Sequence, residues 1–169
     1  GRLVPKKNHE FLIDVVHHLS QKYPKRFVLK IFGEGEMHES LQAKITDYGL
    51  QNSVFLMGVS DSIEEHYRNS DLYLHSAIDE PFGLTILEAM ASGLPVVTLD
   101  GGGNRDFIVH EENGFILPVS DVEAFSDVIM KIVNNSHVYD ALSKKSVETS
   151  RNYDIANYIN KLLEVYETY

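Results

Sequence analysis

The chain has 169 residues, of which 15 are lysine or arginine and 25 are aspartate or glutamate, so its formal net charge is −10. A chain of this length with 43% hydrophobic residues buries one substantial core, which excludes disorder for its bulk. The acidic balance argues against a nucleic-acid partner, and the absence of cysteine excludes disulfides, zinc–thiolate sites and thiol catalysis.

Apolar runs alternate with segments of helical periodicity along the chain. In chain order we predict a helix over 9–22, a strand over 26–32, a helix over 36–48, a strand over 54–57, a short helix over 61–69, a strand over 72–74, a helix over 83–92, strands over 95–99 and 114–117, and helices over 121–134, 138–150 and 153–167. Asn8 and Asp121 are the predicted caps of two of these helices, and Gly49 is the predicted stop of a third.

Strands that alternate with helices indicate an α/β fold. The sequence therefore predicts one Rossmann-like domain over residues 1–169, a parallel sheet with helices on both faces. Ligands of such sheets bind at the carboxyl ends of the strands. The loops at that edge are 33–36, 58–61, 75–83 and 100–105.

The segment over 83–92 is apolar on nearly all sides, which predicts a buried helix whose one charged residue is Glu88. A buried carboxylate requires hydrogen-bond donors or a cation. Two hypotheses stay open: a salt bridge to a core arginine, or a carboxylate that binds ligand hydroxyl groups. Before this helix, Asp79 and Glu80 stand near the free N–H groups of its first turn, which also favour phosphate. They either complement the helix dipole or belong to a ligand site.

Three other features lie at the same edge. His75 ends a predicted strand on the ligand side, which places it to contact a substrate. The run of glycines at 101–103 is either a tight turn or a ligand-binding loop. The pair Gly33 and Gly35 does not complete a dinucleotide fingerprint, because His38 occupies the position of the third glycine.

Residues 80–88, Glu-Pro-Phe-Gly-Leu-Thr-Ile-Leu-Glu, resemble the E-x7-E motif of the retaining glycosyltransferases of family four, within the group 1 glycosyltransferases. The resemblance continues to residue 97. It also covers 1–7, 32–35, 54–58 and 113–118, in the usual order of the family. One departure is Asp106, which stands where many relatives carry a glutamate shortly after the glycines.

The resemblance implies a GT-B enzyme, in which two Rossmann-like domains face each other across a cleft. This chain is then the C-terminal, nucleotide-sugar-binding domain, without the N-terminal domain that supplies most of the acceptor site. The isolated chain is expected to be inactive. By position, the resemblance implies that Arg2 and Lys7 bind the donor diphosphate and that Gly58 lies beside the nucleobase. It implies that Glu80 is the catalytic residue at the donor-sugar hydroxyls and that Glu88 binds the ribose. Sugar and phosphates would be bound by the backbone of Phe82, Gly83 and Leu84, together with Thr85.

The function that the resemblance implies is transfer of a hexose-type sugar from a UDP- or GDP-sugar to a sugar, lipid-linked glycan or other hydroxyl acceptor. We expect bacterial surface polysaccharide synthesis, no metal or other cofactor, and a cytoplasmic location. Peripheral contact with the inner face of the membrane would be made through the N-terminal domain. Two alternatives stay open: a non-catalytic nucleotide-sugar-binding module, and a sugar-nucleotide epimerase on the same architecture. A glycoside hydrolase is disfavoured, because Glu88 on a helix is poorly placed to share a glycosidic bond with Glu80.

Overall fold

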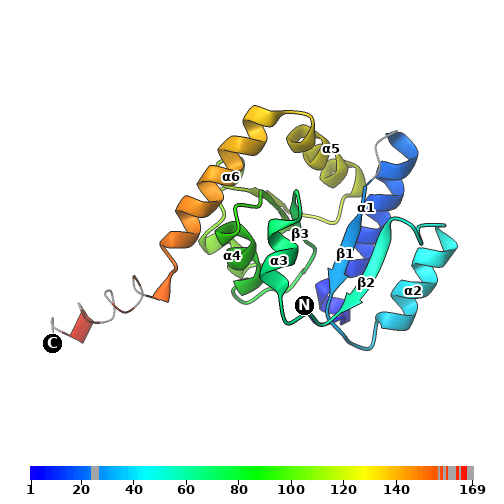
Figure 1. Ribbon diagram of the computed structural model, residues 1–169, viewed down its shortest axis with the longest axis horizontal. Coiled ribbons are helices and arrows are strands. Elements are labelled where there is room, and N and C mark those ends of the chain that lie inside the picture. The colour runs from blue at the N-terminus through cyan, green and yellow to red at the C-terminus, as the bar shows by residue number, and fades with distance from the viewer. Residues whose placement is uncertain (24–26, 156, 158, 160–162, 164, 167–169) are drawn as a thin grey trace.

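Helices and strands alternate along the chain in the computed structural model, which describes residues 1–23, 27–155, 157, 159, 163, 165 and 166 (Figure 1). The strands are β1 (Leu29–Phe32), β2 (Val54–Gly58), β3 (Tyr73–His75), β4 (Val96–Leu99) and β5 (Phe115–Leu117). The α-helices are α1 (His9–Lys22), α2 (His38–Asp47), α3 (Ile63–Arg68), α4 (Leu84–Ala91), α5 (Val122–Val133) and α6 (Ser136–Arg151), with short 3-10 helices η1 (Pro5–Lys7) and η2 (Gly103–Asp106). Of the predicted helix over 153–167, residues 156, 158, 160–162, 164 and 167 lie outside the described residues, as does residue 26 of the predicted strand over 26–32.

The strands pair in parallel, in two groups. β1 pairs with β2, and β4 lies between β3 and β5. Helices α1 and α2 pack against the first group, and α4 and α5 pack against the second. The arrowheads of β1 and β2 point to the edge where the N-terminus lies (Figure 1). The predicted α/β class, parallel strands flanked by helices, is confirmed.

Helix ends follow their local chemistry only in part. The Asp121 carboxylate accepts the N–H of Ala124 at 2.9 Å, which confirms the predicted cap of α5. Gly49 follows α2 with a φ of 67°, the left-handed conformation that ends helices. Asn8 precedes α1 as predicted, but its side chain makes no cap bond; its Nδ2 donates instead to Ser120 Oγ at 3.4 Å.

The start of α2 is displaced from residue 36 to residue 38 by contacts with the N-terminal segment. Leu3 is fully buried, and its N–H donates to the carbonyl of Glu34 at 2.8 Å. The N–H of Met37 donates to the carbonyl of Leu3 at 3.0 Å. The turn before α2 is therefore joined to residue 3 by two backbone hydrogen bonds. No local pattern in residues 33–37 reveals this long-range contact.

The segment that contains η1 is also tied to the loop after β3. The N–H of Ile78 donates to the carbonyl of Lys6 at 3.1 Å, and Ser76 Oγ donates to the carbonyl of Lys7 at 2.7 Å. Behind them, α1 buries one face, and Phe11 of α1 meets Phe125 of α5 edge to face, with ring centroids 5.2 Å apart. Two segments 70 residues apart in sequence are thus held side by side at the edge where the strands end.

Candidate active site

Lys7 and Glu80 form an ion pair at the edge of the sheet where the strands end, with Lys7 Nζ 2.6 Å from Glu80 Oε2. Glu80 is buried, with 8% of its surface exposed. Burial alone would raise the pKa of Glu80, but the hydrogen bond and charge of Lys7 outweigh it, and the pKa lies below its usual value. The structure thus brings together the predicted catalytic residue and a predicted diphosphate ligand, and keeps the carboxylate charged.

The residues next to this pair repeat it at the surface. Lys6 Nζ lies 3.4 Å from Asp79 Oδ2, with 43% and 65% of the two side chains exposed. Exposed pairs of this kind contribute little to stability, about 0–1 kcal/mol. Lys6 and Asp79 therefore offer a matched control for the buried pair one residue along.

The glycine-rich turn holds the backbone of Glu80 in place. The N–H of Glu80 donates to the carbonyl of Gly101 at 2.8 Å, and the N–H of Gly103 donates to the carbonyl of Glu80 at 2.9 Å. A Cβ on Gly101 would lie 2.8 Å from Glu80 Cβ, and one on Gly103 would lie 2.1 Å from the carbonyl oxygen of Pro81. Glycine is required here because the turn packs backbone against backbone. From the sequence, residues 101–103 were either a tight turn or a ligand-binding loop. The contact with the Glu80 loop was not predicted.

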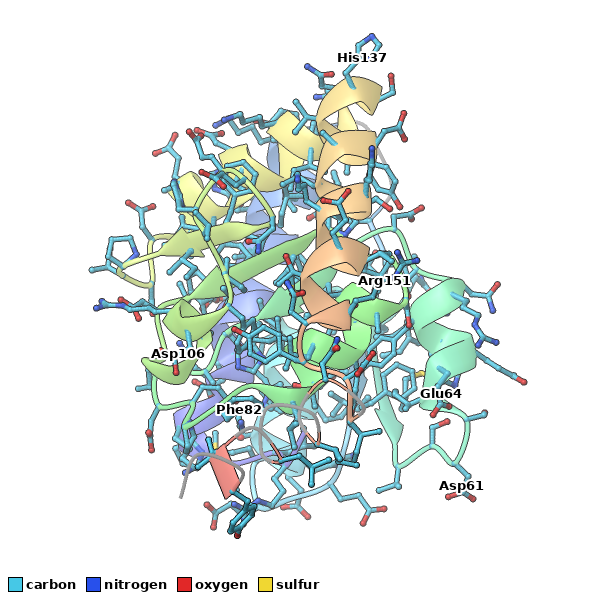
Figure 2. All side chains as sticks on the ribbon, turned by 90° about the vertical axis from the view of Figure 1, so that its left-hand side faces the viewer. Asp61, Glu64, Phe82, Asp106, His137 and Arg151 are labelled. Atoms are coloured by element: carbon cyan, nitrogen blue, oxygen red, sulfur yellow. The ribbon has the colours of Figure 1, made fainter. Side chains whose placement is uncertain are left out.

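The start of α4 presents the motif residues to solvent. Gly83 precedes the helix with a φ of 98°, and a Cβ there would meet Ile86 and Phe107 at 3.1 Å. Its neighbours Phe82 and Leu84 are 42% and 65% exposed. Figure 2 shows Phe82 in the lower half of the molecule, below Asp106 and far from His137 at the top. Exposed side chains therefore flank the buried Gly83 at the N-terminus of α4, where the backbone N–H of Phe82 donates a hydrogen bond to the Glu80 carboxylate.

The prediction that Glu88 is buried was wrong. Glu88 is exposed, and its Oε2 accepts a hydrogen bond from Tyr67 Oη at 3.2 Å. α4 packs against β3, β4 and α6, and buries Ile86, Leu87, Ala89 and Met90. Leu84 and Glu88, one helical turn apart, share the face left uncovered. An apolar composition all round did not imply burial all round, so the argument that a buried Glu88 needs ligand hydroxyls is withdrawn.

Among the described residues, Arg2 and Gly58 make no hydrogen bond or ion pair with Lys7 or Glu80. Arg2 is exposed. Gly58 ends β2 with a φ of 69°, and its carbonyl accepts the N–H of Gly33 at 2.7 Å. Burial raises the pKa of Tyr73 to about 12, and the charges of Glu88 and Glu80 both add to the shift. Tyr73 therefore lies within electrostatic reach of both motif glutamates.

Thr85 connects to the pair through side chains that the motif does not contain. Its hydroxyl lies 2.9 Å from the hydroxyl of Tyr73, which lies 3.4 Å from His75 Nδ1. His75 Nε2 lies 3.1 Å from Glu80 Oε2. Residues i and i+2 of a strand share a face, so the alternation in β3 was the signal for the Tyr73–His75 contact.

Two buried histidines make stability depend on pH. Burial lowers the pKa of His75 to about 4, although Glu80 opposes the shift, and burial also lowers the pKa of His9 to about 4. Above pH 6.5 both rings are neutral in the folded and unfolded chains. As pH falls from 6.5 to 4 only the unfolded chain takes up these protons, so stability is lost in that window. For His75 the loss is about 3 kcal/mol.

Thermal unfolding between pH 8 and 4 measures this effect. We expect the melting temperature to fall below pH 6.5, and the fall to be smaller in His75→Gln than in a His137→Gln control, since His137 is exposed. A melting temperature that stays level from pH 7 to 5 would contradict the assignment of neutral, buried rings.

The described residues were examined for metal-binding groups and for membrane-spanning helices, and they contain neither. Across residues 1–23, 27–155 and the described positions beyond, no three His, Asp or Glu side chains are arranged to hold a metal ion. In the same residues no helix is long and apolar enough to cross a membrane.

Comparison with known proteins identifies the family. Residues 1–152 match the family described as glycosyl transferases group 1. The lipopolysaccharide core biosynthesis glycosyltransferase LpsE of Rhizobium meliloti is 32% identical over 149 residues, which is 88% of this chain and 42% of that protein. LpsE and a matching protein of Haemophilus influenzae are both named as glycosyltransferases, and neither name favours the epimerase or the non-catalytic alternative.

Solved structures share the fold. HepE of Anabaena, in complex with UDP-glucose, superposes with a TM-score of 0.87 at 26% identity, over 100% of this chain and 47% of that chain. The C-terminal domain of LpcC, a group 1 family protein of Francisella tularensis, superposes with a TM-score of 0.80 at 25% identity, over 92% of this chain and 84% of that chain.

The chain spans less than half the length of the first curated relatives that it matches, at 46%, 22% and 32%. Its parallel strands, flanking helices and motif-bearing α4 correspond to the Rossmann-like C-terminal domain of a GT-B protein. With the family match extending from residue 1 to residue 152, the chain belongs to the group 1 glycosyltransferases.

Proposed function

We propose that this chain is the donor-binding domain of a retaining glycosyltransferase that moves a hexose-type sugar from a UDP- or GDP-sugar to a hydroxyl acceptor. The observation that carries the proposal is the buried Lys7–Glu80 pair, joined at 2.6 Å beside the N-terminus of α4. In this proposal Lys7 is the cation that would bind the diphosphate, and Glu80 is the carboxylate that would bind sugar hydroxyls. A relative of the same fold, HepE, is known in complex with UDP-glucose.

The chemistry follows from where charge develops. As the bond between the anomeric carbon and the diphosphate breaks, negative charge grows on the leaving phosphate and positive character on the sugar. Lys7, Arg2 and the N–H groups of 82–84 would meet the phosphate charge, and Glu80 would hold the sugar hydroxyls. As in the retaining family that the motif resembles, the acceptor would attack from the face that the diphosphate leaves. We propose that these groups need no metal ion.

The complete enzyme in this proposal has a second, N-terminal domain that supplies the acceptor site, so the 169-residue chain alone is expected to transfer no sugar. The acceptor that we propose is a sugar or a lipid-linked glycan in bacterial surface polysaccharide synthesis, in line with the name of LpsE. We place the enzyme in the cytoplasm, at the inner face of the membrane, through its N-terminal domain.

Substitution of Lys7 tests the diphosphate site. If Lys7 binds the diphosphate, Lys7→Ala weakens UDP binding about 10- to 150-fold, the range of a hydrogen bond to a charged group, and leaves uridine binding nearly unchanged. Lys6→Ala is the matched control, because the exposed Lys6 pairs with Asp79. Calorimetric titration of each variant with UDP, GDP and uridine provides the measurement. An equal loss for nucleotide and nucleoside would assign Lys7 a structural role only.

A further inference from the structure

His75 is a buried histidine of the site whose two ring nitrogens have different surroundings. It ends β3, and 7% of its surface is exposed. Tyr73 Oη donates its proton to Thr85 Oγ1 at 2.9 Å, which leaves the Tyr73 oxygen to accept the proton of His75 Nδ1 at 3.4 Å. A neutral imidazole carries one proton. Nε2 of His75 is therefore unprotonated, and among the described residues it completes no hydrogen bond.

The unprotonated nitrogen faces a carboxylate. His75 Nε2 lies 3.1 Å from Glu80 Oε2, and Lys7 Nζ lies 2.6 Å from the same oxygen. A lone pair and a carboxylate oxygen repel each other at this distance, and the charge of Lys7 on the shared oxygen offsets the repulsion. A proton on Nε2 would convert the contact into a charge-assisted hydrogen bond. The two arrangements differ by one proton.

Lys7 is the member of this group that a ligand can draw away. Its side chain is 20% exposed, against 10% for Glu80 and 8% for His75, and it carries its charge at the end of a flexible stem. The pairing of β3 with β4 holds His75 in place. If Lys7 leaves, Glu80 stays buried without its cation, which is strongly unfavourable. The imidazole beside Oε2 is able to supply a new one.

We propose that His75 takes up a proton from solvent when a nucleotide sugar draws Lys7 away from Glu80, and that the imidazolium then replaces Lys7 as the cation of the carboxylate. In this exchange Nδ1 keeps its proton on the Tyr73 side, and Nε2 gains the proton that it donates to Glu80 Oε2. The inference rests on the proposed function, because it needs a ligand that attracts Lys7. It follows that the protein binds a nucleotide sugar more tightly as pH falls.

The charges around the ring favour protonation only after the exchange. The titratable groups that face the ring are the N-terminal amine, Lys7, His9, Tyr73 and Glu80. In the free protein burial lowers the pKa of His75 to about 4, against the charge of Glu80 and with the help of Lys7. Loss of Lys7 to the ligand removes one opposing charge, and the diphosphate adds negative charge nearby. Both changes raise the pKa of His75.

Removal of Lys7 tests the exchange without a ligand. Lys7→Met keeps the apolar stem and takes the charge off the shared oxygen. At pH 5 we expect His75 to be mostly neutral in the unaltered chain and about half protonated or more in Lys7→Met, a rise in pKa of about one unit or more. Nuclear magnetic resonance titration measures this, with the His75 signals assigned by their loss in His75→Gln. Lys6→Met, which removes an exposed lysine paired with Asp79, is the matched control and should leave His75 unchanged.

Calorimetric titration with UDP-glucose and GDP-glucose measures the proton itself. The binding heats in two buffers of different ionisation enthalpy give the number of protons taken up per ligand bound. Neither ligand carries a phosphate monoester, whose second pKa lies near 6, so the uptake belongs to the protein. At pH 6 we expect uptake of about 0.2 proton or more in the unaltered chain, a larger uptake at lower pH, and none in His75→Gln. His9→Gln, and His137→Gln at an exposed histidine, should keep the uptake.

The outcomes separate this inference from the function on which it rests. Uptake that disappears in His75→Gln supports the exchange. Binding without uptake at pH 6, or with equal uptake in His75→Gln, overturns it, because the proton then goes to no group or to another group such as Glu80. A His75 that titrates alike in the unaltered chain and in Lys7→Met also overturns it. If neither nucleotide sugar binds at any pH, the proposed function fails instead. If Lys7→Met does not fold, the calorimetry decides.

Discussion

Glu80→Gln is expected to lower the turnover number of the complete enzyme about 10- to 150-fold while leaving UDP affinity nearly unchanged. The carboxylate is buried beside Lys7, and its proposed contacts are with the sugar, which is absent from UDP. These contacts tighten as the sugar gains positive character, so the loss appears in the chemical step. Initial rates with UDP-glucose and GDP-hexoses, together with UDP titrations, measure the two effects separately.

Two further variants give the comparison its meaning. Asp79→Asn removes the exposed neighbouring carboxylate and should leave the turnover number unchanged. If Glu88 binds the ribose, as the family resemblance implies, Glu88→Gln should raise the KM for the donor more than it lowers the turnover number, and should weaken UDP binding, because the ribose is present in UDP. If Glu80→Gln abolishes UDP binding and Glu88→Gln does not, the two roles are reversed. If both variants only melt earlier, the cluster is structural.

Gly103→Ala is expected to destabilise the fold by at least about 3 kcal/mol, at the upper end of overpacking effects, and to reduce turnover. The added Cβ would lie 2.1 Å from the carbonyl oxygen of Pro81, which is backbone and has no rotamer to escape into. To make room, the turn must move away from the loop that holds Glu80, and the carboxylate moves with it. Urea unfolding and initial rates test the two consequences.

The matched control is Gly49→Ala. Gly49, unlike Gly103, has a left-handed φ of 67°, but a Cβ there meets nothing within 4 Å. Its cost should be that of the backbone conformation, about 1 kcal/mol, with no change in turnover because Gly49 ends α2 away from the motif. Equal stabilities and equal rates for the two variants would show that the turn yields without moving Glu80.

The sequence predicted the parts of this fold that are local. The helix over 9–22, the Asp121 cap and the order of the strands depend on periodicity and on residues close to each other in the chain. The family resemblance also indicated Lys7 and Glu80, but not their direct contact, which joins residues 73 apart.

The failures share one physical cause, the placement of neighbours far apart in sequence. The solvent face of α4 is decided by where β3, β4 and α6 lie, so an apolar composition misplaced Glu88 in the core. The packing of Gly103 on Pro81 and the contact of Thr85 with Tyr73 arise only once the strands are side by side. The local sequence singled out Glu88 and the glycines at 101–103. Their neighbours in the fold, which lie far away in sequence, determine what each of them contacts.

The pairing of Lys7 with Glu80 has a consequence for the rate at which a ligand and the site meet. A cation already neutralised at 2.6 Å projects little field into solvent, and the chain as a whole carries a net charge of −10. An anionic nucleotide sugar is therefore not drawn in from a distance, and its arrival depends on diffusion and on contacts made after it reaches the edge. In enzymes that attract their ligand electrostatically, added salt screens the attraction and slows association. Here there is little attraction to screen, so we expect salt to change the association rate little. The rate then depends on how quickly Lys7 exchanges the Glu80 carboxylate for the incoming phosphate.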